Sequence, residues 1–494
     1  MKKKSFLAAL MALVMLCTVF SCGITAVAAD DSTAYGADAY SYVQYLDANL
    51  RARRAGTEQE QKAAAYLTGE LESFGYEVAQ QPFSYTSRGA TVNSQNVIVT
   101  KPGRSEKQII VGAHYDSVNT AGVDDNGSGT SVTLETAKRM FSVSTPYTIK
   151  FIFFGAEEAG LRGSKAYADS MSAEEIANTV LMINLDSILA GTYRYVYGGI
   201  VNEQTGEVDQ AWGVYQTKAL ADELGLGIRL NDTELNALQT PTTGDWSDHA
   251  SFKNIGLPYV YFEAANWELP DDPDHPEWGS TGAYETESGE VMHVPGRDDL
   301  TFIENEWGSR AKDTLAAYAQ LLPAMLQRVS PDGLLADKAA LAAAVDAAKA
   351  VETSKYTEAS VAAFRIALAN AEKVLADDSI LAGDQQKVDF AQKALTAAQN
   401  ALREEKGPVI DWIEHIFKEV FVRVAKVILH IILKIVFSNI NIKAITGNVV
   451  ERFRFRLCFL TFFVRIVLFD ISIFCQFFFD LAQVIFCTCD VQSI

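Results

Sequence analysis

Three apolar segments of the sequence, residues 109–113, 147–154 and 180–185, each predict a buried β-strand that ends in polar residues. A histidine and four carboxylates follow these segments closely: His114, Asp125, Glu157, Glu158 and Asp186. The carboxyl ends of parallel strands lie at one edge of an α/β sheet, so these side chains are predicted to converge there. Imidazole and carboxylate groups suit zinc, and clustered carboxylates repel one another unless a cation neutralises them. The pattern therefore predicts a metal site.

For any one of these segments alone, a capped strand followed by a solvated acidic turn is an ordinary alternative. The adjacent Glu157 and Glu158 also have a structural explanation, because the dipole of a helix stabilises carboxylates near its N-terminus. A fold gains no stability, however, by directing all of these groups to one rim. The metal site is the simpler explanation for the whole set.

The surrounding sequence predicts the elements that must position these residues. Helical spacing predicts two helices within residues 38–76 and further helices at residues 130–141, 211–224 and 307–326. Additional strands are predicted at residues 93–100 and 258–262. Between residues 186 and 243 we expect only Gly- and Tyr-rich turns besides the one helix.

Five short motifs occur in the order that is typical of one enzyme family. They are residues 114–117 (HYDS), 124–129 (DDNGSG), 154–164 (FGAEEAGLRGS), 184–186 (NLD) and 247–252 (SDHASF). On these motifs, residues 38–325 resemble the M28 family of zinc aminopeptidases. The resemblance implies an α/β protein with the three-layer zinc-exopeptidase fold, which has a central mixed, mostly parallel sheet.

The resemblance also implies a reaction and the residues that perform it. The implied metal ligands are His114 and Asp186 for one zinc ion, Glu158 and His293 for the other, and Asp125 as the bridge between them. The expected cofactor is Zn²⁺, two ions per chain, which activate a bridging water. Glu157 would act as the general base, and Asp116 would hold the imidazole of His114 by a hydrogen bond. We expect a secreted dizinc metallo-aminopeptidase that hydrolyses the N-terminal peptide bond of peptides with a free N-terminus.

The last ligand is where the sequence departs from the family pattern. Family members present it as His-Thr-x-x-Asp, whereas His293 is followed by Val, and the first Asp, Asp298, comes one residue late. His275 is the competitor, but prolines on both sides of Asp274 favour an extended surface turn. We expect His293 to be the ligand, with Asp298 or Asp299 directed back at the site.

Other polar residues have more modest expected roles. Asp124 would face away from the metals, and His249 would lie just outside the ligands or line the substrate pocket. Arg54 and Thr57 would form a plain turn and a helix N-cap. Trp246 stands where some secreted members of the family carry a disulfide.

The N-terminus and the net charge indicate location and partners. Residues 1–29 carry three lysines, an apolar run and a small-residue site typical of a secretory signal peptide, while residues 19–22 loosely resemble a lipoprotein site. We expect a secreted or cell-surface associated protein. The formal charge of −20 argues against nucleic acid as a partner. Because no cysteine lies between Cys22 and Cys458, the domain is expected to fold without disulfides.

Composition divides the chain into a signal peptide (1–29), a metallopeptidase domain (30–330), a helical module (331–406) and a hydrophobic tail of unknown role (407–494). The module is Ala-rich with helical apolar spacing, and it resembles the FIVAR modules of secreted and cell-wall-associated bacterial proteins. An unrelated small α-helical bundle fits the same pattern. From this resemblance we expect that the C-terminal regions associate with a cell wall or a membrane surface. The tail, however, lacks an uninterrupted run of about 20 apolar residues, the length that spans a membrane as a helix.

Two other functions fit parts of the sequence. A glutaminyl-cyclase-like acyltransferase shares the scaffold but resembles a single-zinc enzyme, whereas the loop with Asp124 and Asp125 is suited to bridging two metals. A noncatalytic cell-surface binding protein would not need both Glu157 and Glu158. The dizinc aminopeptidase is therefore the leading hypothesis.

Overall fold

The computed structural model describes residues 34–202, 204–230, 241–267 and 289–405, with scattered residues between 412 and 434. The expected signal peptide, the loop that contains His275 and nearly all of the hydrophobic tail lie outside the described residues. The chain divides into two units, a first unit, Met1–Arg403, and a second unit, Glu404–Ile494. Among the described residues, no helix has both the length and the apolar character needed to cross a membrane.

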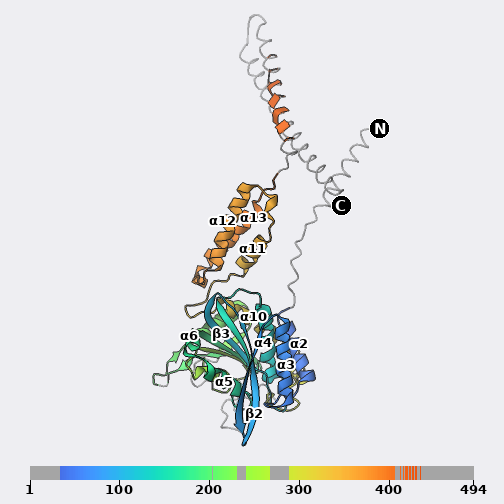
Figure 1. The fold of residues 1–494 in the computed structure, drawn as a ribbon, viewed down its shortest axis with the longest axis vertical. Helices are drawn as coiled ribbons and strands as arrows, with labels where there is room; N and C mark the ends of the chain where they lie inside the picture. The colour runs from blue at the N-terminus through green and yellow to red at the C-terminus, as the bar shows by residue number, and fades with distance from the viewer. Residues whose placement is uncertain are drawn as a thin grey trace, which may run out of the picture. The chain divides into compact units, whose positions relative to one another are not determined.

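The first unit is built on a mixed β-sheet with the strand order β1-β2-β4-β3-β5-β10-β6-β9 (Figure 1). Its strands are β1 (Val78–Ser87), β2 (Ala90–Lys101), β3 (Ser105–His114), β4 (Tyr147–Phe154), β5 (Thr179–Leu185), β6 (Tyr193–Gly198), β9 (Ile228–Leu230) and β10 (Tyr259–Ala265). The central strands β4, β3, β5 and β10 run parallel, and β2 and β6 pair with them antiparallel. A short ribbon of β7 (Ile200–Val201) and β8 (Val208–Asp209) stands apart from this sheet. The expected mixed sheet is confirmed.

The central strands are mostly apolar where both faces of the sheet are covered. In β3, Ile109 and Val111 belong to one hydrophobic core, and Ile110 between them belongs to the other. Successive side chains of a strand point to opposite faces, so a strand buried on both sides has no polar alternation. This is why residues 147–154 are mostly hydrophobic in the sequence.

Helices form the two outer layers. One face of the sheet shares its core with α2 (Ala37–Asn49), α3 (Glu58–Ser73), α4 (Gly129–Met140), α7 (Trp212–Glu223), α9 (Leu300–Trp307) and α10 (Arg310–Arg328). The other face packs against α5 (Arg162–Ser170), α6 (Ala173–Asn178) and α8 (His249–Lys253). Figure 1 shows α2, α3, α4 and α10 on one side of β3, and α5 and α6 on the other.

The sequence located most of these elements, with one clear error. β4 has the predicted bounds, and the helix predicted at residues 130–141 is α4. The expectation of only turns and one helix between residues 186 and 243 is wrong, because β6 lies there and pairs with β10. Tyr195 and Tyr197 of β6 alternate into the core, so the Gly- and Tyr-rich composition that indicated turns belongs partly to a buried strand.

Three helices follow the sheet domain: α11 (Ala339–Lys349), α12 (Glu358–Leu375) and α13 (Gln385–Asn400). Their apolar side chains meet in a separate cluster that includes Val345, Phe364 and Leu395. Arg104, in the turn between β2 and β3, binds the carboxylate of Asp378 through two of its nitrogens. The described helices therefore have a core of their own and a polar contact with the sheet domain.

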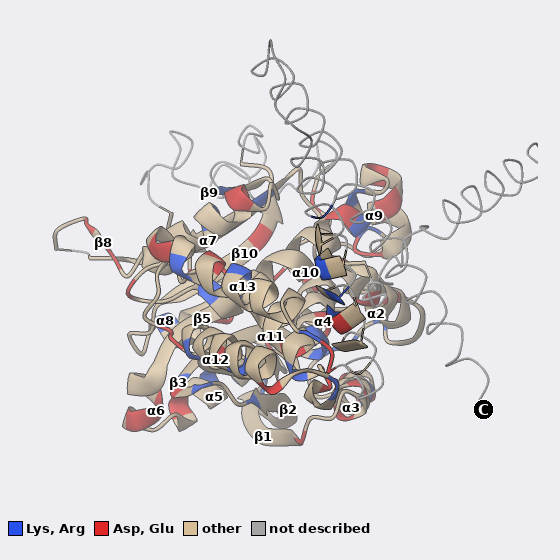
Figure 2. Ribbon diagram, turned by 90° about the horizontal axis from the view of Figure 1, so that it is seen from above, with Lys and Arg blue, Asp and Glu red and all other residues tan. Residues whose placement is uncertain are grey.

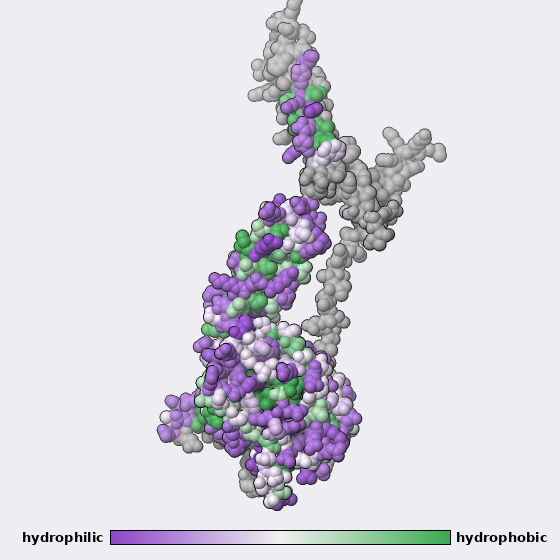
Figure 3. Space-filling view, in the orientation of Figure 1, coloured by the Kyte–Doolittle hydropathy of each residue, from purple (hydrophilic) through white to green (hydrophobic). Residues whose placement is uncertain are grey.

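The surface of the first unit is mixed in character. Figure 2 shows acidic and basic residues interspersed over its helices and strands. Hydrophilic residues cover most of the face in Figure 3, with hydrophobic residues among them on α11, α12 and α13. On these helices, Ile366 of α12 and Phe390 of α13 have 65% and 74% of their surface exposed. Scattered exposed apolar side chains of this kind are ordinary on a folded protein.

Candidate metal centre

The carboxyl ends of three neighbouring strands bring the predicted residues together. His114 is the last residue of β3, and Asp186 directly follows β5. Glu157 and Glu158 lie in the turn between β4 and α5. Because β4, β3 and β5 are adjacent and parallel, these ends lie at the same edge of the sheet, as expected.

Two loops complete the cluster. Asp125 lies in the turn Val123–Ser128, which contains a cis peptide bond between Asp125 and Asn126 and leads into α4. His293 lies in the loop before α9. The potential ligand atoms within each of two groups lie within 4.8 Å of one another, and the groups are His114, Glu157 and Asp186, and Asp125, Glu158 and His293.

Asp125 faces both histidines, each with a different oxygen. Its Oδ1 lies 3.1 Å from Nε2 of His114, and its Oδ2 lies 2.9 Å from Nε2 of His293. One carboxylate thus joins the two groups, as a residue that bridges two cations must. Tetrahedral zinc, with bonds of about 2.0–2.1 Å, holds its ligand atoms roughly 3.3 Å apart. The observed separations are close to this value, so the residues fit metal ions at both positions.

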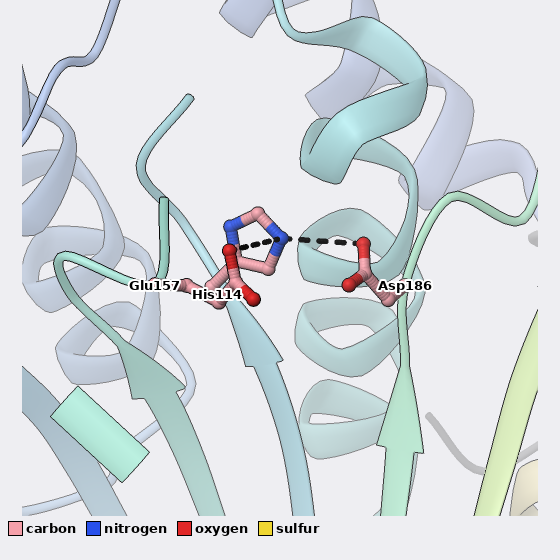
Figure 4. A group of neighbouring side chains, drawn as sticks. All are labelled: His114, Glu157 and Asp186. Atoms are coloured by element: carbon pink, nitrogen blue, oxygen red, sulfur yellow. Dashed lines mark hydrogen bonds and ion pairs between the residues drawn. The ribbon is translucent and has the colours of Figure 1, made fainter. Parts of the chain in front are cut away.

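The two ring nitrogens of His114 have different partners. Nε2 lies 3.2 Å from Oδ1 of Asp186 and 3.9 Å from Oε2 of Glu157 (Figure 4). Nδ1 lies 3.2 Å from the main-chain oxygen of Asp116 and 3.5 Å from its Oδ1. Asp116 therefore contacts the imidazole as expected, although more closely through its main chain than through its carboxylate. A proton on Nδ1 leaves the lone pair of Nε2 directed at the carboxylates.

His293 closes the second group from the solvent side. Its side chain is half exposed, and Nε2 lies 3.0 Å from Oε2 of Glu158. The other oxygen of Glu158 accepts the backbone N–H of Val118 at 3.1 Å. Glu158 is thus fixed at one oxygen and directed at His293 with the other.

Left-handed backbone conformations occur at this site. His293 has φ 63°, and Ala156 and Ser187, which adjoin Glu157 and Asp186, have φ 54° and 50°. Such a conformation costs an ordinary residue roughly 1–3 kcal/mol, and it is typical of functional sites that the surrounding structure holds in place. The backbone is therefore strained where it presents the candidate ligands.

Burial and crowding perturb the acids and bases of the cluster. Desolvation raises the pKa of Glu158 to about 7, and the nearby Asp125 adds to this effect. Desolvation also raises the pKa of Glu157 well above its usual range, although His114 opposes it. Hydrogen bonds to Asp125 and Glu158 raise the pKa of His293 to about 11. The site therefore strongly favours positive charge, which bound cations would supply.

Asp124 points away from the ligands, as expected. Its Oδ1 accepts the backbone N–H groups of Leu189 and Ala190 at 2.7 and 3.0 Å. These residues follow Asp186, so Asp124 anchors the segment that comes after a candidate ligand. The two loops that present Asp125 and Asp186 are in this way held to each other.

Asp298, rather than Asp299, turns back toward the site. It accepts hydrogen bonds from the Thr120 hydroxyl at 3.1 Å and from the backbone N–H of Asp124 at 2.7 Å. Asp299 instead caps α9 by accepting the backbone N–H of Phe302 at 2.8 Å. The loop thus accommodates the extra residue after His293, and Asp298 still reaches the site.

Ser247 was not singled out in the sequence beyond its place in a motif, yet it touches a candidate ligand. Its hydroxyl donates to Oδ2 of Asp186 at 2.6 Å and accepts from the Asn184 amide at 2.7 Å. A serine in a polar turn carries no signal, before the fold is known, that it contacts a metal ligand.

His249 does not line a substrate pocket, because it is fully buried and its ring stacks on those of Tyr259 and Tyr261.

The sequence also contained no indication that Arg53 has a structural role near the site. Thr57 accepts the backbone N–H of Glu60 and is the N-cap of α3, as expected. Arg54 is exposed, whereas Arg53 beside it is buried and donates hydrogen bonds to the loop between His114 and Asp125. Neighbouring arginines in a short linker look alike in the sequence, and only the course of the chain separates them.

Comparison with known proteins supports the same family. Residues 96–318 match the model of peptidase family M28. Leupeptin-inactivating enzyme 1 of Streptomyces exfoliatus is 34% identical over 56% of this chain and 58% of its own length. Aminopeptidase YwaD of Bacillus subtilis (strain 168) is 33% identical over 41% of this chain and 40% of its own length. The chain thus spans about half the length of these relatives.

Two solved structures are similar at a lower level. A zinc aminopeptidase from Bacillus subtilis is 20% identical over 57% of this chain and 94% of its own, with a TM-score of 0.44. A glutaminyl cyclase from Porphyromonas gingivalis is 20% identical over 58% of this chain and 96% of its own, with a TM-score of 0.43. The match of residues 96–318 to peptidase family M28, the similarity to these relatives and the two ligand groups together support a zinc-dependent aminopeptidase.

Proposed function

We propose that this protein is an exported dizinc aminopeptidase that removes the N-terminal residue of peptides. The observation that carries the proposal is the position of Asp125, whose two oxygens face His114 and His293 at 3.1 and 2.9 Å. A single-metal site needs no such carboxylate between two histidines. The proposed ligand sets are His114 and Asp186 for one ion, Glu158 and His293 for the other, and Asp125 for both.

Glu157 is the proposed general base. It borders the His114 group, but its Oε2 lies farther from Nε2 of His114 than the oxygens of Asp125 and Asp186 do. A carboxylate beside the ligands can take a proton from the attacking water and return it to the leaving amine. Zinc, when bound, polarises the scissile carbonyl and lowers the pKa of water. Glu157 would carry out the proton transfer itself.

The substrate class follows from the family and from the open side of the site. Peptides with a free N-terminus are the proposed substrates, since the half-exposed His293 leaves the metal centre accessible at its own edge. Export through the N-terminal signal peptide, and attachment to a cell wall or membrane surface through the C-terminal regions, remain proposals that rest on the sequence. The FIVAR-like nature of helices α11, α12 and α13 is proposed on the same basis.

A glutaminyl-cyclase-like acyltransferase is the alternative. It would use one zinc ion, so it predicts that only one of the two ligand groups binds metal tightly. The test is the zinc content of the purified protein, measured together with its activity on a panel of peptides and on N-terminal glutamine peptides. We expect two zinc ions per chain, amino-acid release that a chelator abolishes, and recovery with zinc or cobalt. One zinc ion with full activity and pyroglutamate formation would establish the alternative instead.

A further inference from the structure

Arg53 lies in the linker between α2 and α3, and only 1% of its surface is exposed. Its guanidinium donates hydrogen bonds to four main-chain oxygens: those of Tyr115 (2.7 Å), Leu50 (3.0 Å), Ala121 (2.8 Å) and Gly122 (2.7 Å). No carboxylate among the described residues lies within ion-pair distance of it. A buried arginine is normally paired with an acid. Arg53 is unusual because its guanidinium donates hydrogen bonds to main-chain oxygens instead.

Three of the four acceptors belong to one loop, residues 115–122. This loop joins His114 to the turn that carries Asp125, so its conformation sets the distance between one candidate ligand and the bridge. Arg53 thus holds the loop at both ends, at Tyr115 and at Gly122.

The backbone of the linker strengthens the same contact. The backbone N–H of Arg53 donates to the Ser117 hydroxyl at 3.1 Å, and the N–H of Ser117 donates to the carbonyl of Arg53 at 3.3 Å. The N–H of Ala52 donates to the carbonyl of Thr120 at 2.8 Å. The linker and the loop are therefore joined along their length, with the guanidinium at the centre.

Gly122 provides independent evidence that the loop is shaped around this side chain. It has φ 63°, and a Cβ atom there would lie 2.7 Å from Nη2 of Arg53 and 2.5 Å from Cβ of Ser117. No other residue type could let the guanidinium approach the Gly122 carbonyl so closely.

We infer that Arg53 is a positioning residue for the metal centre: its guanidinium fork fixes loop 115–122 so that Asp125, the proposed bridge between two cations, faces the cation position of His114. The role depends on the planar array of donors, which reaches oxygens on both sides of the loop. A lysine ammonium is a single point with three donors and cannot span these acceptors. The inference rests on the proposed two-metal function.

The test compares Arg53→Lys with Arg54→Lys in the full-length protein. Arg54 is the adjacent, exposed arginine, so its variant is a matched control. Zinc affinity is measured by competition with a chelator, and the cobalt-substituted protein is examined by its visible absorption spectrum. We expect Arg53→Lys to bind zinc about 10–100-fold more weakly, the usual effect of losing a residue that orients ligands, and to show a changed cobalt spectrum. Arg54→Lys should match the wild type in both.

A second variant keeps the arginine and disturbs its acceptor. Gly122→Ala should displace the guanidinium, weaken zinc binding and change the cobalt spectrum relative to the wild type. Because this comparison needs only the wild type, it also tests the inference if Arg53→Lys does not fold. Wild-type zinc affinity and an unchanged cobalt spectrum in the folded variant, even with a lower melting temperature, would overturn the inference. Wild-type protein that binds a single zinc ion would refute the dizinc proposal alone, because the effect of Arg53 on that one ion would still be measurable.

Discussion

The carboxylate of Asp116 accepts the backbone N–H of Glu157 at 2.9 Å. Its other oxygen accepts the backbone N–H of Glu158 at 3.3 Å, and its main-chain oxygen lies 3.2 Å from Nδ1 of His114. A residue two positions after one candidate ligand therefore sets the turn that presents the next ligand and the proposed base. The ends of β3 and β4 are coupled through this one side chain.

Replacing Asp116 with Asn should disturb all three of these residues. The amide group of Asn keeps one acceptor but turns an N–H donor toward one of the two backbone N–H groups, which leaves a buried donor without a partner. We expect zinc affinity and turnover each to fall by about 10–100-fold, as for other residues that orient ligands. Chelator competition and steady-state kinetics measure these effects. Asp169→Asn, at an exposed carboxylate on α5, is the control, and equal values for both variants would contradict the coupling.

Substitution of Glu157 and substitution of Glu158 are expected to have different effects on zinc content and turnover. Glu157→Gln should retain both zinc ions and lose about 10²–10⁴-fold in turnover, because an amide cannot accept and return the proton. Glu158→Gln should instead lower the zinc content, since its Oε2 faces His293 at 3.0 Å. Zinc analysis and kinetics on the same samples separate the two effects. Full zinc content in both variants, with only Glu158→Gln inactive, would show that the roles are reversed.

The last ligand can be identified by paired alanine variants. His293 lies 2.9 and 3.0 Å from carboxylate oxygens of Asp125 and Glu158, whereas His275 lies outside the described residues. His293→Ala should lose about one zinc ion per chain and most of the activity, because a site with an incomplete ligand set binds zinc weakly. His275→Ala should retain both ions. The opposite pattern of zinc loss would assign the ligand to His275.

His249 should make stability depend on pH. Burial lowers its pKa from the usual 6.5 to about 4, and its Nε2 donates to the Gly244 carbonyl at 2.9 Å. Between pH 4 and 6.5 the His249 imidazole is protonated in the unfolded chain but not in the folded chain. The contribution of His249 to stability therefore falls as the pH falls through this window and is constant above it. The loss by pH 4 should be roughly 3 kcal/mol.

His249→Gln provides the comparison, because a neutral amide can donate to Gly244 without titrating. Denaturant unfolding of both metal-free proteins between pH 4 and 7 gives the difference in the free energy of unfolding. The difference should change with pH only below about pH 6.5. A constant difference across the range would show that His249 binds its proton equally in both states.

Removal of the C-terminal regions should leave the peptidase domain folded. Val329 and Leu334 pack against the core of the sheet domain, so the cut is placed after Leu334. The contact between Arg104 and Asp378 is partly exposed and contributes about 0–1 kcal/mol. We expect a soluble chain with wild-type zinc content and turnover. Aggregation of this chain, with a soluble full-length protein, would show that α11, α12 and α13 cover part of the domain's core.

The sequence by itself determined which residues meet at the candidate metal centre. His114 and Asp186 stand at the ends of apolar runs, and a strand that is buried on both faces is recognisable because most of its residues are apolar, without regular polar alternation. Strand ends of a parallel sheet meet at one edge, so the convergence of these residues with Glu157 and Glu158 followed from the pattern. His293 was chosen over His275 on local grounds, and the structure brings it to the cluster.

The tertiary structure alone decided how the site is supported. Arg53, Ser247 and the carboxylate of Asp116 act on residues that are distant in the chain or across a turn, and no spacing rule encodes such contacts. β6 was missed because its Gly- and Tyr-rich composition is also that of turns, and only its pairing with β9 and β10 in the folded sheet identifies it as a strand. Hydrophobic periodicity reports which face of an element is buried, but hydrogen bonds between loops depend on where the folded chain places both partners.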